Sequence, residues 1–405
     1  MDSVMRLAEE VMARCRLLAS YSERAEGLTR TFLSAPVCDC HLLISKWMRA
    51  LGMRVATDAI GNLRGVYAGA GDETRRLLIG SHIDTVPDAG AFDGVLGVML
   101  GLALVAGLAG KRLPYEIEVI AFSEEEGVRF RTPFLGSRAV TGALSASDPE
   151  LVDEHGVTIA QAIRDFGLDP ARIGEARIDA RRAIGFVEFH IEQGPVLDEA
   201  GVGTAVVEAI AGQSRFDVTF RGAANHAGTT PMQRRRDALA GAAEWIGAVE
   251  REALATDGSV ATVGSIVCIP NAGNVIAGEA RVSLDVRHRA DEVRLSLVKR
   301  LLDFAEEIAA RRNLKVAWNE RLNEPAIQMD PDLLQLAART TPFRMVSGAG
   351  HDAMILAAVV PSVMFFLRSP GGISHHPDES VRVEDVASAI LAGLGLLAEI
   401  AKRYN

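Results

Sequence analysis

The sequence predicts an α/β fold, with a mixed, mostly parallel sheet flanked by helices and a smaller α+β domain inserted into it. Three observations lead to this prediction. Continuously apolar runs alternate with helical stretches early in the chain, as in βαβ units whose parallel sheet is covered on both faces. From about Ala205, apolar and polar residues alternate, which is typical of half-exposed antiparallel strands. The tail then returns to the first pattern.

The first part of the chain begins with apolar residues at helical spacing over residues 4–53, and a break is expected at Ser34-Ala35-Pro36. Strand-like runs follow at residues 62–67 and 77–79, and the second run opens into a loop that ends at Pro87. A helix is expected over residues 95–108 and a continuous strand over 117–122. This order favours βαβ units.

The inserted domain is predicted from alternating strands at residues 216–220 and 280–286 and from helices at 237–251 and 291–311. We expect it to span residues 207–323, and the segments 1–206 and 324–405 to form the other domain. In the tail, a helix is expected at 352–358, a strand at 363–367 and a C-terminal helix from 383 to about 402.

Composition excludes several classes of protein. A net charge of −10 argues against a nucleic-acid-binding surface, which needs positive charge to displace counterions. No apolar run is long enough to span a membrane, and the N-terminus lacks the apolar core of a signal peptide. Four cysteines are too few for a disulfide framework, and Cys38 and Cys40 lack a second pair for a zinc site. We therefore expect a cytoplasmic protein with neither a nucleic-acid nor a membrane partner.

Polar clusters follow several of the predicted strands. Ligand sites in α/β proteins gather where parallel strands end. The clusters contain His82 and Asp84, Asp93, the run Glu124-Glu125-Glu126, His190, and His375. In the His-x-Asp pair, the Asp84 carboxylate can hold one nitrogen of His82 while the other nitrogen binds a metal ion.

Each cluster has an ordinary structural explanation when taken alone. A histidine beside a strand is most often a satisfied core residue, and consecutive glutamates usually form a solvated turn. Three carboxylates directly after a buried strand repel one another, however, so a positive group is expected beside them. A metal site explains all five clusters together, and this mixture of imidazole and carboxylate suits Zn²⁺ or Mn²⁺.

The chain resembles a known family in eight segments that occur in family order between about residues 60 and 385. These segments are GSHIDTVPDAGAFDGVLGV, FSEEEGVRF, LGSRAVTG, EFHIEQGPVL, NHAGTTPM, NAGNVIAGE, SGAGHDAM and GGISHHPDES. The family is the hydantoinase/carbamoylase branch of the aminoacylase-like metallopeptidases. It includes allantoate amidohydrolases, N-carbamoyl-L-amino-acid hydrolases, β-ureidopropionases and ureidoglycolate hydrolases.

The resemblance implies two divalent metal ions, Zn²⁺ or Mn²⁺, about 3.5 Å apart. One ion would be held by His82 and His190 and the other by Glu126 and His375, with Asp93 bridging them. Glu125 matches the general base of the family. Asp84 is also expected to be a catalytic residue. Two ambiguities remain in the register: Glu124 leaves a shift by one residue open, and His376 is an alternative ligand to His375.

The resemblance also implies substrate-binding residues, several of them in the inserted domain. His226 matches a histidine that donates to the oxyanion of the tetrahedral intermediate. Because the insert makes the dimer contact in the family, His226 is expected to serve the neighbouring subunit of a homodimer. Asn274 and Arg287 match the substrate-binding pair and are expected near His226; the planar fork of arginine suits a carboxylate.

Three further residues, Gln193, His351 and Gly372, match positions that line the site. The chain departs from the family pattern at Val128, where a small residue is common, and at His376, where serine or asparagine is usual.

The expected reaction is hydrolysis of a ureido C–N bond with release of ammonia and carbon dioxide. Allantoate is the favoured substrate, N-carbamoyl-L-amino acids are the second choice, and a peptidase or aminoacylase activity is the third. A binding protein that keeps the fold without turnover is disfavoured, because Glu125 and all five metal-ligand positions are present.

Overall fold

The computed structural model describes residues 2–71 and 75–404. The chain forms two compact units: the main unit, Met1–Glu208 with Met329–Asn405, and the insert, Ala209–Gln328. The boundaries expected from the sequence were 206/207 and 323/324. Among the described residues no helix is both long and apolar enough to cross a membrane.

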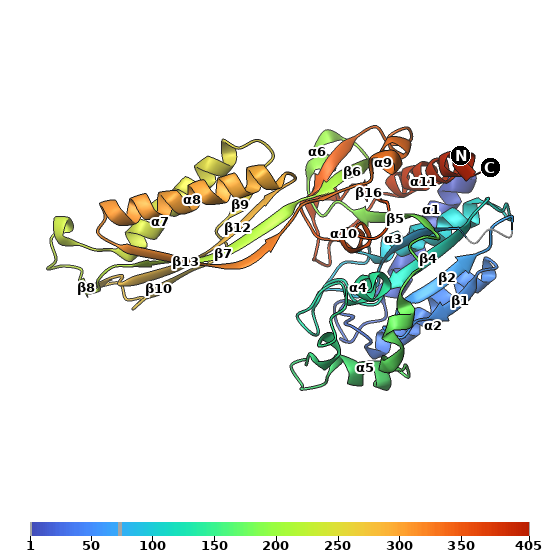
Figure 1. The fold of residues 1–405 in the computed structure, drawn as a ribbon, viewed down its shortest axis with the longest axis horizontal. Coiled ribbons are helices and arrows are strands. Elements are labelled where there is room, and N and C mark those ends of the chain that lie inside the picture. Colours follow the sequence, from blue (N-terminus) through green and yellow to red (C-terminus); the bar gives the residue numbers. More distant parts are fainter. Residues whose placement is uncertain (1, 72–74, 405) are drawn as a thin grey trace. The chain divides into compact units, whose positions relative to one another are not determined.

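The main unit is built on a nine-stranded sheet with the order β1-β2-β4-β3-β5-β16-β6-β14, and β15 also pairs with β6 (Figure 1). The short strand β14 pairs with the last residues of β6, and these paired residues fall within the range of the insert. The four central strands, β4, β3, β5 and β16, are mutually parallel, whereas the strands at either side pair antiparallel. The predicted mixed, mostly parallel sheet is therefore confirmed at its centre. The strands are β1 (Arg54–Thr57), β2 (Leu63–Tyr67), β3 (Arg76–His82), β4 (Glu116–Phe122), β5 (Ala183–Ile191), β6 (Thr204–Ile210), β14 (Ile327–Gln328), β15 (Arg344–Ser347) and β16 (Ser362–Leu367).

Helices cover this sheet. The α-helices of the main unit are α1 (Asp2–Ala19), α2 (Ala35–Ala50), α3 (Val95–Gly107), α4 (Leu135–Thr141), α5 (Ile159–Asp165), α6 (Val196–Ala200), α9 (Pro331–Ala337), α10 (Asp352–Leu356) and α11 (Val383–Tyr404). Its short 3₁₀ helices are η1 (Asp148–Glu150), η2 (Pro170–Ala176) and η4 (Pro370–Gly372). The expected break before α2 is confirmed, but residues 20–34 form a loop rather than a continuation of the first helix.

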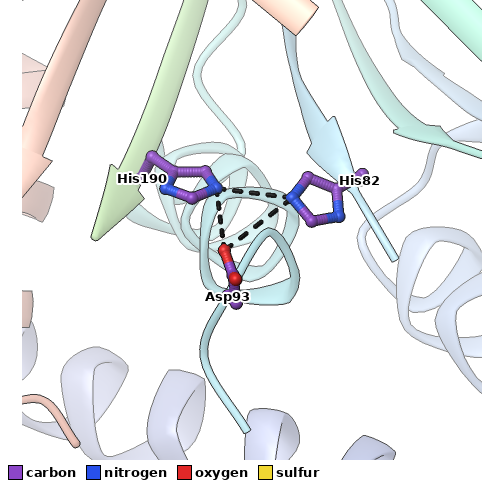
Figure 2. Close-up of side chains that lie close together, drawn as sticks. All are labelled: His82, Asp93 and His190. Carbon is purple, nitrogen blue, oxygen red and sulfur yellow. Dashed lines mark hydrogen bonds and ion pairs between the residues drawn. The ribbon is translucent and has the colours of Figure 1, made fainter. Parts of the chain in front are cut away.

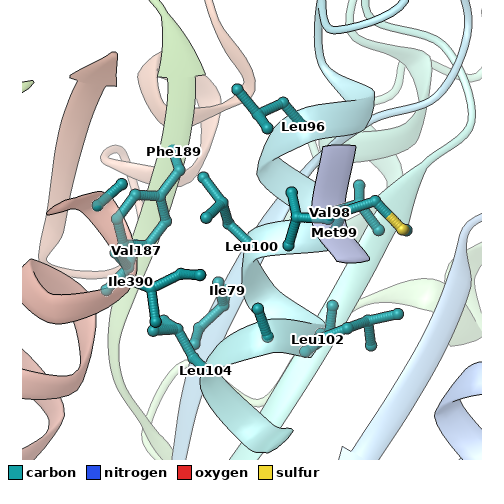
Figure 3. Close-up of a cluster of buried hydrophobic side chains, with 14 of the residues drawn as sticks. Ile79, Leu96, Val98, Met99, Leu100, Leu102, Leu104, Val187, Phe189 and Ile390 are labelled. Carbon is teal, nitrogen blue, oxygen red and sulfur yellow. The ribbon is translucent and has the colours of Figure 1, made fainter. Parts of the chain in front are cut away.

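Helix α3 lies at the centre of the core (Figure 3). It packs on β3, β4 and β5 and also contacts α1 and α11. Its residues from Val95 to Val105 are all buried, which explains why the sequence there is apolar on every side. The close approach depends on Gly97, because a Cβ atom at this position would lie 2.1 Å from the main-chain oxygen of Phe189 on β5.

The insert consists of an antiparallel sheet and two long helices (Figure 1). Its five-stranded sheet has the order β10-β12-β7-β13, with β9 also paired to β12. Its elements are β7 (Gly212–Arg221), β8 (Asn225–His226), η3 (Met232–Arg234), α7 (Ala238–Leu254), β9 (Val260–Thr262), β10 (Ile266–Ile269), β11 (Val275–Ile276), β12 (Glu279–His288), α8 (Asp291–Arg311) and β13 (Lys315–Glu324). The predicted alternation in β7 and β12 places one face of each strand against the helices, in a core around Trp245 and Phe220.

Candidate metal centre

Two histidines and one aspartate bring three ligand atoms together inside the main unit (Figure 2). The Nε2 atoms of His82 and His190 lie 3.4 Å apart, and Asp93 Oδ1 lies 3.9 Å from the first and 3.1 Å from the second. All three side chains are at most 3% exposed. They form the first ligand group.

The topology of the sheet produces this group. His82 is the last residue of β3, and His190 stands near the end of β5, its parallel neighbour. Asp93 comes just before α3. The chain turns at the next residue, Gly94, which has φ 66° and precedes the first residue of the helix. A Cβ atom at Gly94 would lie 2.4 Å from the His82 ring, so glycine is needed both for the turn and for the contact.

Hydrogen bonds orient both imidazole rings. His82 Nδ1 lies 3.0 Å from the main-chain oxygen of Asp84, and His190 Nδ1 lies 2.9 Å from the main-chain oxygen of Ile191. Since a carbonyl oxygen can only accept, both Nδ1 atoms carry a proton, and the Nε2 atoms face Asp93 and each other. In the neutral ring Nε2 holds the lone pair that binds a metal ion. Two ring nitrogens and a carboxylate oxygen that face one another in a buried space can hold a positive charge between them, either a proton shared with Asp93 or a metal ion.

A second ligand group contains Asp93, Glu126 and His375. His375 Nε2 lies 3.2 Å from Asp93 Oδ2 and 3.6 Å from Glu126 Oε1. Asp93 thus directs one oxygen to each group, as a bridging carboxylate must. His376 instead contacts Asp378 at the surface and belongs to neither group. The geometry therefore favours His375 over His376 as the ligand.

The three consecutive glutamates point to different surroundings. Glu125 and Glu126 form a further group of ligand atoms with His82, whereas Glu124 is fully buried and belongs to none of these groups. Burial, reinforced by Asp84 and Glu126, raises the pKa of Glu124 well above its usual value. The arrangement favours Glu125 as base and Glu126 as ligand over a shift by one residue.

Asp84 contacts His82 as expected and has a second role that the sequence did not predict. Its carboxylate lies 3.5 Å from His82 Nδ1, and its main-chain oxygen lies closer, at 3.0 Å. The carboxylate also accepts hydrogen bonds from the main-chain N–H groups of Glu125 and Glu126, at 3.0–3.1 Å. A local motif cannot reveal this, because the two donors arrive from the end of β4.

The electrostatics of the site fit divalent cations. Burial alone would raise the pKa of the Asp93 carboxyl group. Hydrogen bonds from His190 and His375 outweigh this effect and hold the pKa well below its usual value. Burial among other carboxylates raises the pKa of Glu125 well above its usual value and that of Glu126 to about 7. A bound cation would favour the ionised form of both glutamates. Imidazole and carboxylate donors together suit Zn²⁺ or Mn²⁺.

Several buried polar residues support the site, and one of them, Glu188, was not predicted from the sequence. Glu188 on β5 accepts hydrogen bonds from the Ser81 hydroxyl and from the main-chain N–H of Ala353. His351, expected to line the site, packs its ring 4.5 Å from that of His190, and its Nε2 lies 3.0 Å from the Ser347 hydroxyl. A glutamate inside an otherwise apolar strand was the one available clue to this network.

Two other predicted lining residues lie beside the second group. Gln193 Nε2 lies 3.2 Å from Asp93 Oδ2 and 3.3 Å from His375 Nε2. Gly372, with φ 68°, packs closely against the main chain at Pro195, where a Cβ atom would lie 3.0 Å from the proline nitrogen. Both contacts connect the segment after β5 with the segment that carries His375.

The three predicted residues of the insert do not lie together. His226 on β8 pairs with Val275 on β11, and the neighbouring Asn274 accepts a hydrogen bond from Ala227 N. β12 begins at Glu279, shortly after Asn274 in the sequence, and Arg287 stands near its other end. The two strand positions are eight residues apart, a separation of roughly 25 Å along the strand. The expectation that Arg287 lies near His226 is therefore wrong within one copy of the insert.

Arg287 is also engaged in an ion pair. Its guanidinium donates to both oxygens of Asp285, from Nε at 2.9 Å and from Nη2 at 3.1 Å. Asp285 also accepts from Arg215 and Gln213, so the arginine forms part of a polar cluster on the sheet. The sequence did not indicate this pairing.

Comparison with known proteins gives consistent matches. Residues 78–402 match the model of peptidase family M20/M25/M40. The chain is 38% identical to allantoate deiminase 1 of Glycine max, over 97% of this chain and 90% of the relative. It is 40% identical to an N-carbamoyl-L-amino acid amidohydrolase of Geobacillus stearothermophilus, over 89% and 90%. A solved amidase of the hydantoinase/carbamoylase family from Burkholderia ambifaria matches with a TM-score of 0.91 and 32% identity, over 97% of both chains.

Proposed function

Because this chain belongs to peptidase family M20/M25/M40, a family of hydrolases, we propose that it cleaves the ureido C–N bond of allantoate and releases ammonia and carbon dioxide. The observation that carries the proposal is the pair of ligand groups that share the buried Asp93, with Glu125 beside them. Relatives named for allantoate and relatives named for N-carbamoyl-L-amino acids both match over most of the chain. N-carbamoyl-L-amino acids are therefore the second candidate substrate.

The proposed mechanism assigns proton transfer to Glu125. His82, His190 and Asp93 would hold one divalent ion, and Glu126, His375 and Asp93 the other. When bound, such ions supply Lewis acidity and lower the pKa of water. Glu125 is well placed as a base because it is buried and its main-chain N–H is fixed by Asp84. It accepts a proton from the attacking water and later gives it to the leaving nitrogen.

The roles proposed for the insert complete the site. His226 donates to the oxyanion of the tetrahedral intermediate. Asn274 binds the substrate beside it, and Arg287 binds the substrate carboxylate, for which its planar fork is suited. We propose that the protein works as a homodimer in the cytoplasm.

The test is hydrolysis of a panel of compounds by protein loaded with Mn²⁺ or with Zn²⁺, measured by ammonia release for the ureido compounds and by release of the free amino acid for the others. The panel contains allantoate, several N-carbamoyl-L-amino acids, an N-acetyl amino acid and a dipeptide. We expect the highest kcat/KM for allantoate. A higher value for an N-carbamoyl-L-amino acid would make that compound, rather than allantoate, the substrate. Hydrolysis of only the last two compounds would refute the ureido assignment.

Metal removal tests the mechanism separately from the substrate. Chelation should abolish turnover while the far-ultraviolet circular dichroism persists, because a chain of this size holds its core without a metal ion. Full activity in the chelated protein would refute the metal-dependent mechanism.

A further inference from the structure

Glu379 is a buried carboxylate that the proposed mechanism does not use. It is 5% exposed, and its carboxyl group lies against the segment that carries Asp93. Oε1 accepts hydrogen bonds from the main-chain N–H groups of Phe92 and Asp93, both at 3.0 Å. Oε2 accepts from the hydroxyl of Ser374, at 3.3 Å. One side chain thus connects two segments that are about 280 residues apart in sequence.

Each of these segments carries a residue of the second ligand group. Asp93 follows Phe92 directly, and His375 follows Ser374. The main chain at His375 has φ 53°, a left-handed conformation that costs a non-glycine residue about 1–3 kcal/mol and persists only where the surroundings enforce it. Glu379 encloses this turn, because its own N–H donates to the main-chain oxygen of His376.

The space for Glu379 is provided by Gly90. A Cβ atom at Gly90 would lie 2.3 Å from Glu379 Cβ and 2.5 Å from Oε1, closer than real Cβ contacts permit. No left-handed φ angle explains this glycine. Gly90 therefore lacks a side chain because the Glu379 side chain occupies the space that a Cβ atom would need.

We propose that Glu379 is a positioning residue of the metal centre, which sets Asp93 and His375 at the separation that the second metal ion requires. Its hydrogen bonds fix the main chain from which the Asp93 side chain projects and, through Ser374, the turn that presents His375. The first ion depends on it less, because His82 and His190 stand on the rigid parallel strands β3 and β5. This inference rests on the metal centre assigned under the proposed function.

The test measures metal binding rather than activity. Wild type, Glu379→Ala and Glu379→Gln are titrated with Mn²⁺ and with Zn²⁺ against a chromophoric chelator, and the ions bound per chain are counted after dialysis. Removal of an outer-shell partner typically weakens metal binding by about 10–100-fold. We expect a loss of this size for one of the two ions in Glu379→Ala and a smaller change for the other ion. Glu379→Gln keeps an acceptor oxygen and should lie closer to wild type.

Gly90→Ala provides an independent variant, because it leaves every proposed ligand and Glu379 itself in place. Its Cβ would displace the Glu379 side chain, so it should reproduce the selective loss of one ion. Gly174→Ala is the matched control, since a Cβ atom at that position meets nothing within 4 Å. Unchanged metal binding in Glu379→Ala and Gly90→Ala would overturn the proposal.

Two further outcomes separate the alternatives. Equal weakening of both ions, together with a lower Tm of the metal-free variants, would show that Glu379 only supports the fold and would also overturn the proposal. If wild type itself binds no divalent ion, the proposed function fails together with this inference. If wild type binds two ions and the variants bind them equally well, only this inference fails.

Discussion

Glu125 and Glu126 are adjacent in sequence but meet different surroundings. The Asp84 carboxylate accepts from the main-chain N–H groups of both residues and so fixes the segment after β4. From this segment Glu126 reaches Asp93 and His375, whereas Glu125 groups with His82 and Glu126 only. The shared carboxylate of Asp93 therefore lies within reach of Glu126, and Glu125 is the residue that we propose for proton transfer.

The first prediction separates these two glutamates. Glu125→Gln should retain both metal ions and lose about 10²–10⁴-fold in kcat, which is the usual contribution of a general base. Glu126→Gln should instead lower the occupancy of one ion. Metal analysis and steady-state kinetics on the same preparations decide between them. Exchanged phenotypes would mean that the assignment is off by one residue.

The second prediction concerns pH. Burial raises the pKa of Glu126 to about 7 from its usual 4.5. The hydrogen bond between His375 and Asp93 raises the pKa of His375. Without metal, the folded protein therefore keeps protons near neutral pH that the unfolded chain has already lost. These protons stabilise the folded state at lower pH, and their contribution to stability is lost as the pH rises through about 7. A metal ion must displace these protons.

The rise in Tm that Mn²⁺ produces should therefore be larger at pH 8 than at pH 6. Groups outside the site have the same surroundings with and without the ion, so their effect cancels in this difference. Scanning calorimetry with and without the ion, in a non-coordinating buffer, measures it. Glu126→Gln should flatten the dependence, and an equal metal effect at both pH values in wild type would contradict the prediction.

At the scale of secondary structure, the site depends on how closely α3 approaches the parallel strands. His82 and His190 end neighbouring strands, while Asp93 reaches them from the start of α3. The helix can lie this close because Gly97 faces the main chain of Phe189, one residue before His190.

The third prediction tests this packing. Gly97→Ala would place a Cβ atom 2.1 Å from a backbone oxygen that cannot move aside. We expect a loss of about 1–3 kcal/mol in the free energy of unfolding, as for other overpacked cores, although alanine favours helix more than glycine does. Urea denaturation of the metal-free protein measures it.

Gly107→Ala on the same helix is the control for this experiment. Its Cβ would lie 3.1 Å from the ends of the Leu394 side chain, which can rotate away. The change in stability should be small. Equal effects at the two positions would show that the approach of α3 to β5 does not limit stability.

Much of this architecture could be predicted, because strands buried on both faces are continuously apolar and half-buried strands alternate. β3, β4 and β16 show the first pattern, and β7 and β12 the second. β13 gave no signal, since most of its residues are exposed and follow neither pattern. Periodicity thus reports burial, and an exposed strand escapes it.

The metal-ligand candidates could be predicted because they follow strands whose ends meet at one edge of a parallel sheet. Their supports could not. Glu188 and Glu379 each accept a hydrogen bond from a segment more than 100 residues away, as the pairs Ser81–Glu188 and Asp93–Glu379 show. Only the fold brings such partners together, so no local pattern marks them.

At the scale of the whole molecule, the proposed residues are divided between the two units. The metal-ligand candidates and Glu125 lie in the main unit, whereas His226, Asn274 and Arg287 lie in the insert. Within the insert, His226 and Asn274 are neighbours, and Arg287 stands roughly 25 Å away along β12. A small ureido acid cannot touch both ends of one copy. If all three residues bind substrate, the two ends of an insert must therefore serve different sites.

The fourth prediction follows from this division: each active site of a homodimer contains the partner subunit's His226. Mix Glu125→Gln with His226→Ala, each inactive alone, in equal amounts, and allow the subunits to exchange. In a heterodimer, one site would then carry both defects and the other neither. Half of the dimers would hold one intact site of two, so about a quarter of wild-type activity should return. Asn274→Ala should complement Glu125→Gln in the same way, because Asn274 lies beside His226. No recovery in proven heterodimers would place His226 in the site of its own chain, and Arg287 would then have to act outside that site.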